Sequence, residues 1–391
     1  MIQLSLSVYV HWPFCAKKCP YCDFNTYVVK GCVDFREWGD AYIKRLSFYK
    51  PLLQKNGVST LFIGGGTPSL VPVSEIDCIV RFVSDFQKVP FEVTIEMNPR
   101  DITRQKLIEL KNCGINRVSV GIQSVQPERL KFLGRDHSAE DAIRSMEEVS
   151  SIFSNYSFDL ISGTYGQTTE GWRWELDTVM KYKPSHLSVY HLTIEPKTKF
   201  NSLKNRGLLR EIDDEMALQL YEVTNELLES YGLRRYEISN YARKGYESVH
   251  NLSYWKYEEY IGIGPGAHGR IRAQSYQLLA DSFEPFSCHS VALVDDYYYE
   301  QWFSKVKQNA DCINTVEFLD EKAVFMEKLL TGLRLESGVK IDDIMMQNLK
   351  FSTVQSLCND NMLWYDKETC FMGVPLDKFR LLNHIISSLI Q

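Results

Sequence analysis

The chain of 391 residues has no apolar run long enough to cross a bilayer, and its longest apolar segments have the length of a strand. It also has no excess of basic residues, because 44 Lys and Arg stand against 50 Asp and Glu and the net charge is -6. A protein that binds nucleic acid usually carries a basic footprint. We therefore expect no membrane span and no nucleic-acid partner, and the length suggests two domains.

The first residues lack a positively charged leader followed by an apolar core, so we expect a cytoplasmic protein that is not exported. Ten cysteines then do not indicate a disulfide framework, because clustered thiols in a reducing compartment more often bind metal or do redox chemistry. Three of them, Cys15, Cys19 and Cys22, have the spacing C-x3-C-x2-C. The other seven are scattered singly, and we assign them no role.

Apolar segments of strand length alternate with amphipathic segments of helix length over the first half of the chain. The segments rich in β-branched and aromatic residues are 5–12, 59–66, 91–99, 116–124, 156–163 and 185–194. The predicted helices between them span 34–53, 73–86, 103–114 and 138–153, with starts marked by Ser74, Thr103 and Ser138 and one stop by Gly114. This alternation predicts an α/β fold with a parallel sheet, closed or nearly closed as a (β/α) barrel.

Polar or glycine-rich features follow five of these strands, at the carboxyl ends where such folds carry their chemistry. They are the cysteines after the first strand, Gly64 to Thr67 after the second, Glu96, Gln123 and, within the fifth, Asp159. Each has an ordinary explanation by itself, such as a tight turn or a solvated cap. Their joint placement at one rim predicts a functional site.

The three cysteines lie on a loop directly after a strand, where three sulfurs can converge on one cluster. A four-iron cluster normally takes four thiolates, so three leave one iron open to the amine and carboxylate of a small molecule such as S-adenosylmethionine. The alternative is a closed zinc site with His11 as the fourth ligand, in a non-catalytic interaction protein. His11 lies inside the predicted strand, however, and the residue at 24 is Phe.

The C-x3-C-x2-C loop with Tyr21 before its last cysteine resembles the hallmark of the radical S-adenosylmethionine enzymes. More narrowly, the stretches YVHWPFC, FIGGGTPSLV, IEMNPRDIT, NRVSVGIQS, FLGRDHS and FDLISG resemble the coproporphyrinogen dehydrogenase branch. Residues 239–269 are similar to the HemW-type heme chaperones of that branch. The resemblance implies an incomplete TIM-type barrel of the radical SAM kind, and it extends more weakly into the C-terminal region.

The resemblance implies that Cys15, Cys19 and Cys22 hold a [4Fe-4S] cluster and that S-adenosylmethionine binds beside it. Backbone atoms of the glycine-rich loop would meet the methionine end of the cofactor, which requires residues without bulk. The residues that match the family's cofactor positions are Tyr9, Tyr21, Gly65, Gly66, Thr67, Glu96, Gln123, Arg135 and Asp159. Without the resemblance, the charged residues among them would be explained as well by ion pairs.

Phe24 separates two activities within this branch. The resemblance implies that the coproporphyrinogen dehydrogenases carry a fourth cysteine two residues after the third, whereas the heme chaperones have an aromatic residue there. This chain reads Cys22-Asp23-Phe24. We therefore expect a heme chaperone in porphyrin metabolism, with the oxygen-independent coproporphyrinogen III dehydrogenase as the alternative, so that enzymatic activity stays open.

The stretch from His250 to Trp255 matches the H-N-x-x-Y-W signature of the heme chaperones. Imidazole is the commonest axial ligand of heme iron, so we predict that His250 binds heme, although a histidine beside aromatics is often a core residue. The resemblance further implies hemoprotein acceptors, most simply those of the respiratory chain. Peripheral membrane association and a homodimer are left open. One departure is Thr164-Tyr165, where relatives usually have Leu-Pro.

The C-terminal part begins after the turn-rich stretch 281–290. We predict helices over 292–308 and 315–339, followed by short helices and a hairpin around Asp366-Lys367, which together suggest a mostly helical, winged-helix-like module. Its mixed charge favours partner docking or substrate covering over DNA binding. The predicted division is a radical SAM core at 1–235, a connecting segment at 236–285 and a C-terminal domain at 286–391.

Overall fold

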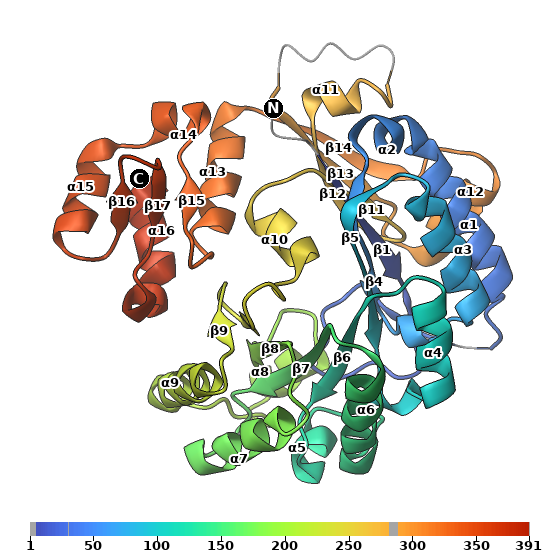
Figure 1. Ribbon diagram of the computed structural model, residues 1–391, viewed down its shortest axis with the longest axis horizontal. Coiled ribbons are helices and arrows are strands. Elements are labelled where there is room, and N and C mark those ends of the chain that lie inside the picture. Colours follow the sequence, from blue (N-terminus) through green and yellow to red (C-terminus); the bar gives the residue numbers. More distant parts are fainter. Residues whose placement is uncertain (1–4, 30, 281–287, 391) are drawn as a thin grey trace.

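The computed structural model describes residues 5–29, 31–280 and 288–390. Its central element is a mixed sheet in the order β14-β13-β12-β11-β1-β4-β5-β6-β7-β8-β10-β9. The sheet curves into an open barrel whose two edge strands do not pair with each other (Figure 1). The incomplete barrel predicted from the sequence is confirmed.

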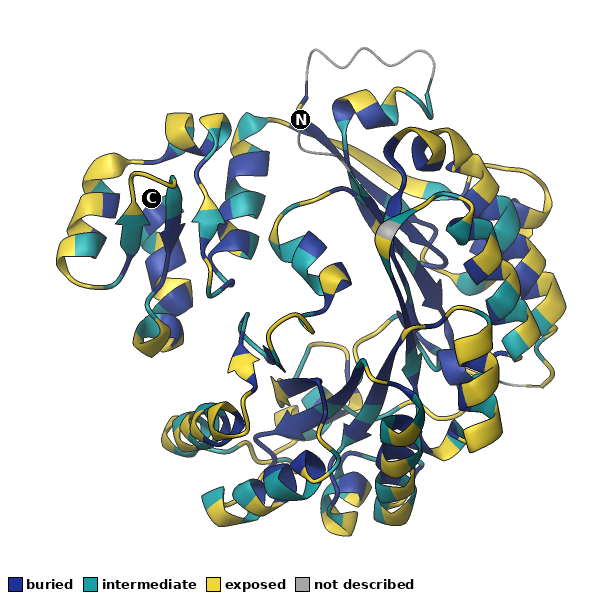
Figure 2. Ribbon diagram, viewed as in Figure 1, coloured by how far each residue is buried: buried dark blue, intermediate teal, exposed yellow. Residues whose placement is uncertain are grey.

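Six parallel strands form the middle of the sheet, and they are the six that the sequence predicts. They are β1 (Leu6–Trp12), β4 (Val58–Gly65), β5 (Gln87–Met97), β6 (Arg117–Gln123), β7 (Tyr156–Ser162) and β8 (His186–His191). Both faces of these strands are largely buried, as the dark sheet in Figure 2 shows, which explains why they read as continuous apolar runs. Register pairs Val8 with Leu61 and Ile95 with Val118, so the strand ends meet at one rim.

Helices cover the convex face of the sheet and expose their outer sides (Figures 1 and 2). In chain order they are α1 (Phe35–Phe48), α2 (Lys50–Asn56), α3 (Val73–Ser84), α4 (Arg104–Asn112), α5 (Pro127–Phe132), α6 (Ala139–Ile152), α7 (Thr169–Met180), α8 (Lys199–Asn205) and α9 (Asp214–Ser230), with 3-10 turns η1 (Pro68–Leu70) and η2 (Pro99–Asp101).

The predicted helix starts are confirmed at two of three positions. Thr103 accepts a hydrogen bond from the Lys106 N–H, and Ser138 forms a reciprocal capping box with Asp141. Ser74 instead lies inside α3, which begins one residue earlier after Pro72. The single helix predicted over 34–53 is two helices, because Pro51 favours the first turn of a new helix over the interior of a long one.

The sheet continues beyond β1 through four more strands, which are β11 (Tyr260–Ile263), β12 (His268–Arg272), β13 (Ser290–Asp295) and β14 (Ile313–Leu319). β11 is parallel to β1, and the next three pairings are antiparallel. The predicted helices over 292–308 and 315–339 are therefore wrong at their starts. Only α12 (Tyr299–Lys307) and α13 (Glu321–Gly332) are helical there, because VALVD and TVEFL pair with each other as strands.

A buried ion pair ties this sheet extension to the first helix. Arg45 on α1 contacts Asp295 at the end of β13 with 2.6 Å between nitrogen and oxygen, and both side chains are at most 4% exposed. Asp295 also accepts a hydrogen bond from Trp302 Nε1 at 2.8 Å. The carboxylate is thus compensated by several donors, as a buried charge requires.

A second apolar core, separate from that of the barrel, lies in the C-terminal region and includes Leu329, Met345, Met372 and Ile385. Its elements are α13, β15 (Val339–Lys340), α14 (Asp343–Asn348), α15 (Phe351–Asn359), β16 (Trp364–Asp366), β17 (Phe371–Gly373), the 3-10 helix η4 (Leu376–Leu381) and α16 (Leu382–Ile390). β16 and β17 form the predicted hairpin around Asp366-Lys367. The predicted boundary at 285–286 lies outside the described residues.

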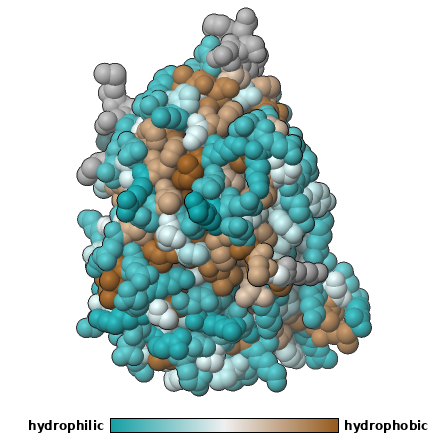
Figure 3. All heavy atoms as spheres, turned by 90° about the vertical axis from the view of Figure 1, so that its right-hand side faces the viewer, coloured by the Kyte–Doolittle hydropathy of each residue, from teal (hydrophilic) through white to brown (hydrophobic). Residues whose placement is uncertain are grey.

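β9 (Arg234–Arg235) ends the core, and the connecting segment contributes β10 (Asn240–Ala242), α10 (Val249–Trp255) and α11 (Ala273–Tyr276) besides β11 and β12. A small parallel pair, β2 (Phe14–Cys15) and β3 (Tyr27–Val28), flanks the cysteine loop. On the face shown in Figure 3, hydrophilic residues predominate and hydrophobic ones gather in patches between them. No helix among the described residues is both long and apolar enough to span a bilayer.

Candidate cofactor site

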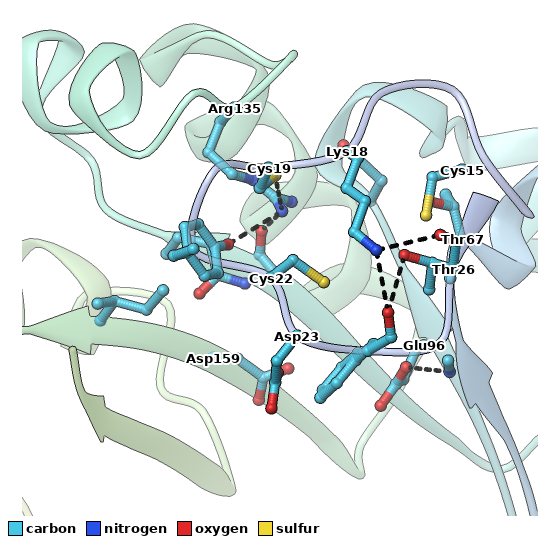
Figure 4. Close-up of a pocket in the computed structure, with 18 of the residues that line it drawn as sticks. Cys15, Lys18, Cys19, Cys22, Asp23, Thr26, Thr67, Glu96, Arg135 and Asp159 are labelled. Carbon is cyan, nitrogen blue, oxygen red and sulfur yellow. Dashed lines mark hydrogen bonds between the residues drawn. The ribbon is translucent and has the colours of Figure 1, made fainter. Parts of the chain in front are cut away.

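A cavity of about 420 Å³ opens at the carboxyl ends of the parallel strands. We call it the main cavity, and its volume lies in the range of ordinary small-molecule sites. Figure 4 shows the cysteine loop on one side of it and the carboxylates of Glu96 and Asp159 on the other. All the residues predicted to hold the cluster or the cofactor line this cavity, except Tyr9. The lining residues among them are Cys15, Cys19, Cys22, Tyr21, Gly65, Gly66, Thr67, Glu96, Gln123, Arg135 and Asp159.

The cysteine loop runs between β2 and β3 and is held by a turn in which the Cys22 N–H donates to the Cys19 carbonyl at 3.2 Å. Burial raises the pKa of the Cys15 and Cys22 thiols. Hydrogen bonds from Thr67 and Thr26 act in the opposite direction at Cys15. The thiols are therefore protonated at neutral pH until a metal displaces their protons.

Arg135 follows α5 and reaches across the cavity to the cysteine loop. One guanidinium nitrogen lies 3.5 Å from Cys19 Sγ and 3.4 Å from the Tyr21 hydroxyl, and the other donates to the Gly121 carbonyl at 3.1 Å. Burial lowers the pKa of Arg135, but Tyr21 and Cys19 more than offset it and the net pKa is raised. A fixed positive charge therefore lies beside Cys19, one of the three cysteines of the C-x3-C-x2-C motif.

The glycine-rich loop at the end of β4 is pressed against β1. The Gly66 N–H donates to the Trp12 carbonyl at 2.6 Å and the Thr67 N–H donates to the Phe14 carbonyl at 2.9 Å. A Cβ at Gly65 would lie 2.5 Å from the His11 ring, and one at Gly66 would lie 2.6 Å from the Phe14 carbonyl oxygen. Gly65 also has a φ of 105°, which favours glycine.

Glu96 and Asp159 form the acidic wall of the main cavity. Glu96 accepts a hydrogen bond from the Gly65 N–H at 3.0 Å, and burial together with the Asp159 charge raises its pKa to about 7. Burial also raises the pKa of Asp159, against hydrogen bonds such as that from Ser119 at 3.0 Å. The two carboxyls therefore share a buried site in which each is harder to ionise than in water.

Tyr9 and His11 occupy the strand beneath the cavity. The Tyr9 hydroxyl lies 3.0 Å from His11 Nδ1, and His11 Nε2 lies 2.9 Å from the Asn25 carbonyl oxygen. Both nitrogens of His11 are thus committed to other partners, which argues against its role as a zinc ligand. In the described parts of the chain, no three His, Cys, Asp or Glu side chains converge as a single ion would need. In an iron–sulfur cluster each thiolate binds a different iron, so the three cysteines need not converge on one point. Their arrangement therefore suits a cluster better than a single zinc ion.

α10, which carries the H-N-x-x-Y-W stretch, packs on the concave side of the sheet (Figure 1). His250 is 1% exposed; its Nδ1 lies 2.7 Å from Thr60 Oγ1 and its Nε2 lies 2.7 Å from the Tyr254 hydroxyl. Its ring stacks on Phe62 with 4.9 Å between centroids. A heme ligand needs a ring nitrogen that is free to bind iron, but in this conformation both ring nitrogens of His250 are engaged inside the barrel. As a heme ligand, His250 stays a prediction.

The sequence reasoning missed the wall formed by the end of β8, where Tyr190, His191, Leu192, Thr193 and Glu195 line the main cavity. The strand was predicted at 185–194. The strand-end argument used for Glu96 and Gln123 would have found these residues, had it been applied to the sixth strand.

Comparison with known proteins identifies the family of this chain. Residues 9–178 match the model of the radical SAM superfamily. A solved structure described as coproporphyrinogen III oxidase (HemN) from Escherichia coli, a radical SAM enzyme, aligns with a TM-score of 0.79 over 100% of this chain and 91% of its own, at 20% identity. These matches, with the open barrel and the cysteine loop, define a radical SAM protein.

Several curated relatives are named heme chaperone HemW, among them proteins from Escherichia coli and Lactococcus lactis. The one from Escherichia coli is 37% identical over 69% of this chain and 72% of its own length, and the one from Lactococcus lactis is 30% identical over 98% and 97%. A mouse relative, named radical S-adenosyl methionine domain-containing protein 1, mitochondrial, is 38% identical over 68% of this chain, and the match spans 61% of its length. The chain belongs to the HemW-type family of the radical SAM superfamily.

Proposed function

We propose that this protein is a cytoplasmic heme chaperone, which binds heme and delivers it to hemoproteins of the respiratory chain. The observation that carries the proposal is the match to relatives named heme chaperone HemW, one of which aligns over 98% of this chain. That match includes the connecting segment and the C-terminal region as well as the barrel. The similarity to a coproporphyrinogen III oxidase is at 20% identity and supports the fold alone.

The residues of the main cavity fit the two cofactors that the family implies. Cys15, Cys19 and Cys22 are proposed to hold a [4Fe-4S] cluster, and Gly65 and Gly66, which line the cavity, are proposed to present backbone atoms to a bound methionine moiety. When bound and reduced, such a cluster supplies an electron that can cleave the sulfonium bond of S-adenosylmethionine.

The other proposed S-adenosylmethionine residues surround this space. Glu96 and Asp159 offer negative charge to a cationic cofactor, and Arg135 holds Cys19 and Tyr21 in place. The remaining proposed contacts are made by Thr67 and Gln123, which line the cavity, while Tyr9 acts from beneath it through His11.

Phe24 supports the chaperone over the oxidising enzyme. It lies where a fourth cysteine would stand in the coproporphyrinogen dehydrogenases, and it is 56% exposed at the mouth of the main cavity. An exposed phenylalanine offers no thiolate, so the proposed cluster relies on three cysteines.

His250 is proposed as a heme ligand on the family signature. To bind iron, its imidazole would have to leave Thr60 or Tyr254 and α10 would have to move away from the sheet. His250→Ala should then lower heme affinity without changing cluster content. A control histidine should be exposed and lie away from the main cavity, which excludes His137, since it is 5% exposed and hydrogen-bonded to the Ile122 carbonyl. His384, exposed on α16, is the better control.

The second apolar core supports the proposed division into a core at 1–235, a connecting segment at 236–285 and a C-terminal domain at 286–391.

A homodimer and peripheral membrane association belong to the proposal as well. Light scattering and flotation with liposomes test them.

The proposed function is tested by two assays on one anaerobically reconstituted preparation, with iron and sulfide counted in parallel. A heme titration followed by absorption should show saturable binding, and incubation with coproporphyrinogen should yield no protoporphyrinogen. Conversion of coproporphyrinogen without heme binding would identify an oxidising enzyme instead. A preparation without iron and sulfide would point back to the zinc-binding alternative.

A further inference from the structure

The end of β8 places one exposed histidine on the wall of the main cavity. His191 is the last residue of the strand, and its side chain lines the cavity. In the described part of the chain its hydrogen bonds involve the backbone alone, and the ring nitrogens have no partner. Partial burial lowers the pKa of His191, so the imidazole is neutral at pH 7 and keeps a lone pair for a metal.

The other histidines lack this combination of exposure, free nitrogens and position. His11, His186 and His250 have partners at both ring nitrogens, and His137 is buried with one nitrogen bound. The remaining three are exposed but do not line the main cavity, and these are His268, His289 and His384. His191 is therefore the imidazole that a large ligand arriving at this cavity meets.

The ring of His191 is held in place by the neighbouring strand. It packs over Gly163, where a Cβ would lie 2.3 Å from the ring carbon Cε1. Gly163 has a φ of 83°, and the Leu192 N–H donates to the Ser162 carbonyl at 2.8 Å. The backbone after β7 thus leaves the space that the imidazole occupies, and the side chain is positioned without using its nitrogens.

Two further exposed side chains, which do not line the main cavity themselves, belong to segments close to His191. Tyr165, at the position where the chain departs from the family pattern, is 56% exposed. Arg210 lies 6.0 Å from the centre of the Tyr165 ring and donates to its hydroxyl at 3.4 Å. Tyr165 follows Gly163 by two residues, and Gly163 is the residue on which the His191 ring packs. The imidazole, the aromatic ring and the guanidinium are thus linked by a chain of contacts, from His191 to Gly163, two residues before Tyr165, and from Tyr165 to Arg210.

These three groups match the chemistry of heme. Heme iron takes an axial imidazole, the porphyrin face packs on aromatic rings, and the propionates are carboxylates that pair with arginine. We propose that heme docks at the rim formed by His191, Tyr165 and Arg210, with His191 as an axial ligand of the iron. This site rests on the proposed function, and it adds a place of entry that the buried His250 does not offer in this conformation.

The test is a hemin titration of the anaerobically reconstituted protein, followed by difference absorption in the Soret region. His191→Ala should weaken binding by at least about ten-fold, since it removes an iron–nitrogen bond, and should shift the Soret maximum. Added imidazole should restore the parent spectrum in this variant. Arg210→Gln should weaken hemin binding about two- to ten-fold. High salt should make this difference from the parent smaller, because it screens the charge of Arg210. His384→Ala is the matched control and should leave the titration unchanged.

Iron and sulfide are counted on the same samples, and they should not change in any of these variants. Parent-like affinity and spectrum for His191→Ala would overturn this site while leaving the proposed function standing. So would loss of the axial ligand signature in His250→Ala alone. Failure of the unmodified protein to bind hemin would overturn the proposed function, and this site with it.

Discussion

Replacing Glu96 with Gln should make the protein more stable, and the gain should grow with pH. Glu96 lies beside Asp159 on the wall of the main cavity, and burial followed by the Asp159 charge raises its pKa from the ordinary value of 4.5 to about 7. Since each pKa unit is worth about 1.36 kcal/mol, ionisation in the folded state costs about 3 kcal/mol more than in the unfolded chain.

The direction of the pH effect follows from the raised pKa. Below pH 4.5 the carboxyl is protonated in both states, and its full contribution to stability is present. As the pH rises from 4.5 to about 7, the unfolded chain releases the proton while the folded protein holds it, so stability falls. Gln has no such proton. The free energy of unfolding of the variant, minus that of the parent, should therefore increase by about 3 kcal/mol over this range.

Urea unfolding of both proteins at a series of pH values, without S-adenosylmethionine, measures this difference. The observable is how the difference in unfolding free energy between the two proteins changes with pH. The amide also changes the strength of the hydrogen bond from the Gly65 N–H, but this effect is the same at every pH. Glu222→Gln, on the exposed surface of α9, is the control for exchanging a carboxylate for an amide. A difference between Glu96→Gln and the parent that stays constant between pH 4 and pH 8 would refute the reasoning about the acidic wall.

Changing any one of the three motif cysteines to Ala should abolish the brown colour after anaerobic reconstitution, while Cys32→Ser should retain it; an iron assay that shows loss in the Cys32 variant alone would contradict the assignment. Gly65→Val should weaken S-adenosylmethionine binding, because a side chain would enter the loop at a φ of 105°, whereas Gly207→Ala, at a positive φ in open space, controls for backbone strain in the same equilibrium dialysis. Asp295→Asn should lower the free energy of unfolding by about 3–5 kcal/mol, since it leaves Arg45 buried without its partner, and a denaturation curve like the parent's would count against that pair.

The barrel and its rim were predictable because their signals are local. Each parallel strand is a buried run bounded by turn residues, and the strand-end rule then places Glu96, Gln123 and Asp159 at one cavity without knowledge of contacts. The cysteine loop carries its own spacing.

The antiparallel extension was not predictable in the same way. Residues 292–295 and 315–319 are short and are followed directly by amphipathic helices, so their apolar residues were assigned to the helical period. Only their pairing with each other and with β12 makes them strands.

The burial of His250 depends on contacts between distant segments. Thr60, 190 residues away in the sequence, holds its Nδ1, and Glu92 accepts the backbone N–H of His250 at 3.1 Å. No pattern within the H-N-x-x-Y-W stretch reports these partners, so the stretch marks the family without showing whether its imidazole is accessible.

A heme chaperone must pass its bound heme on to another protein. The measurement is the transfer of heme from the anaerobically reconstituted, heme-loaded protein to an excess of an apo-hemoprotein, followed by the appearance of the acceptor's absorption spectrum. The proposed function predicts transfer of close to one heme per chain. This transfer should be faster than transfer to the same acceptor from a control protein loaded with hemin, such as serum albumin. A protein that takes up no heme, or holds it without transfer while converting coproporphyrinogen, would contradict it.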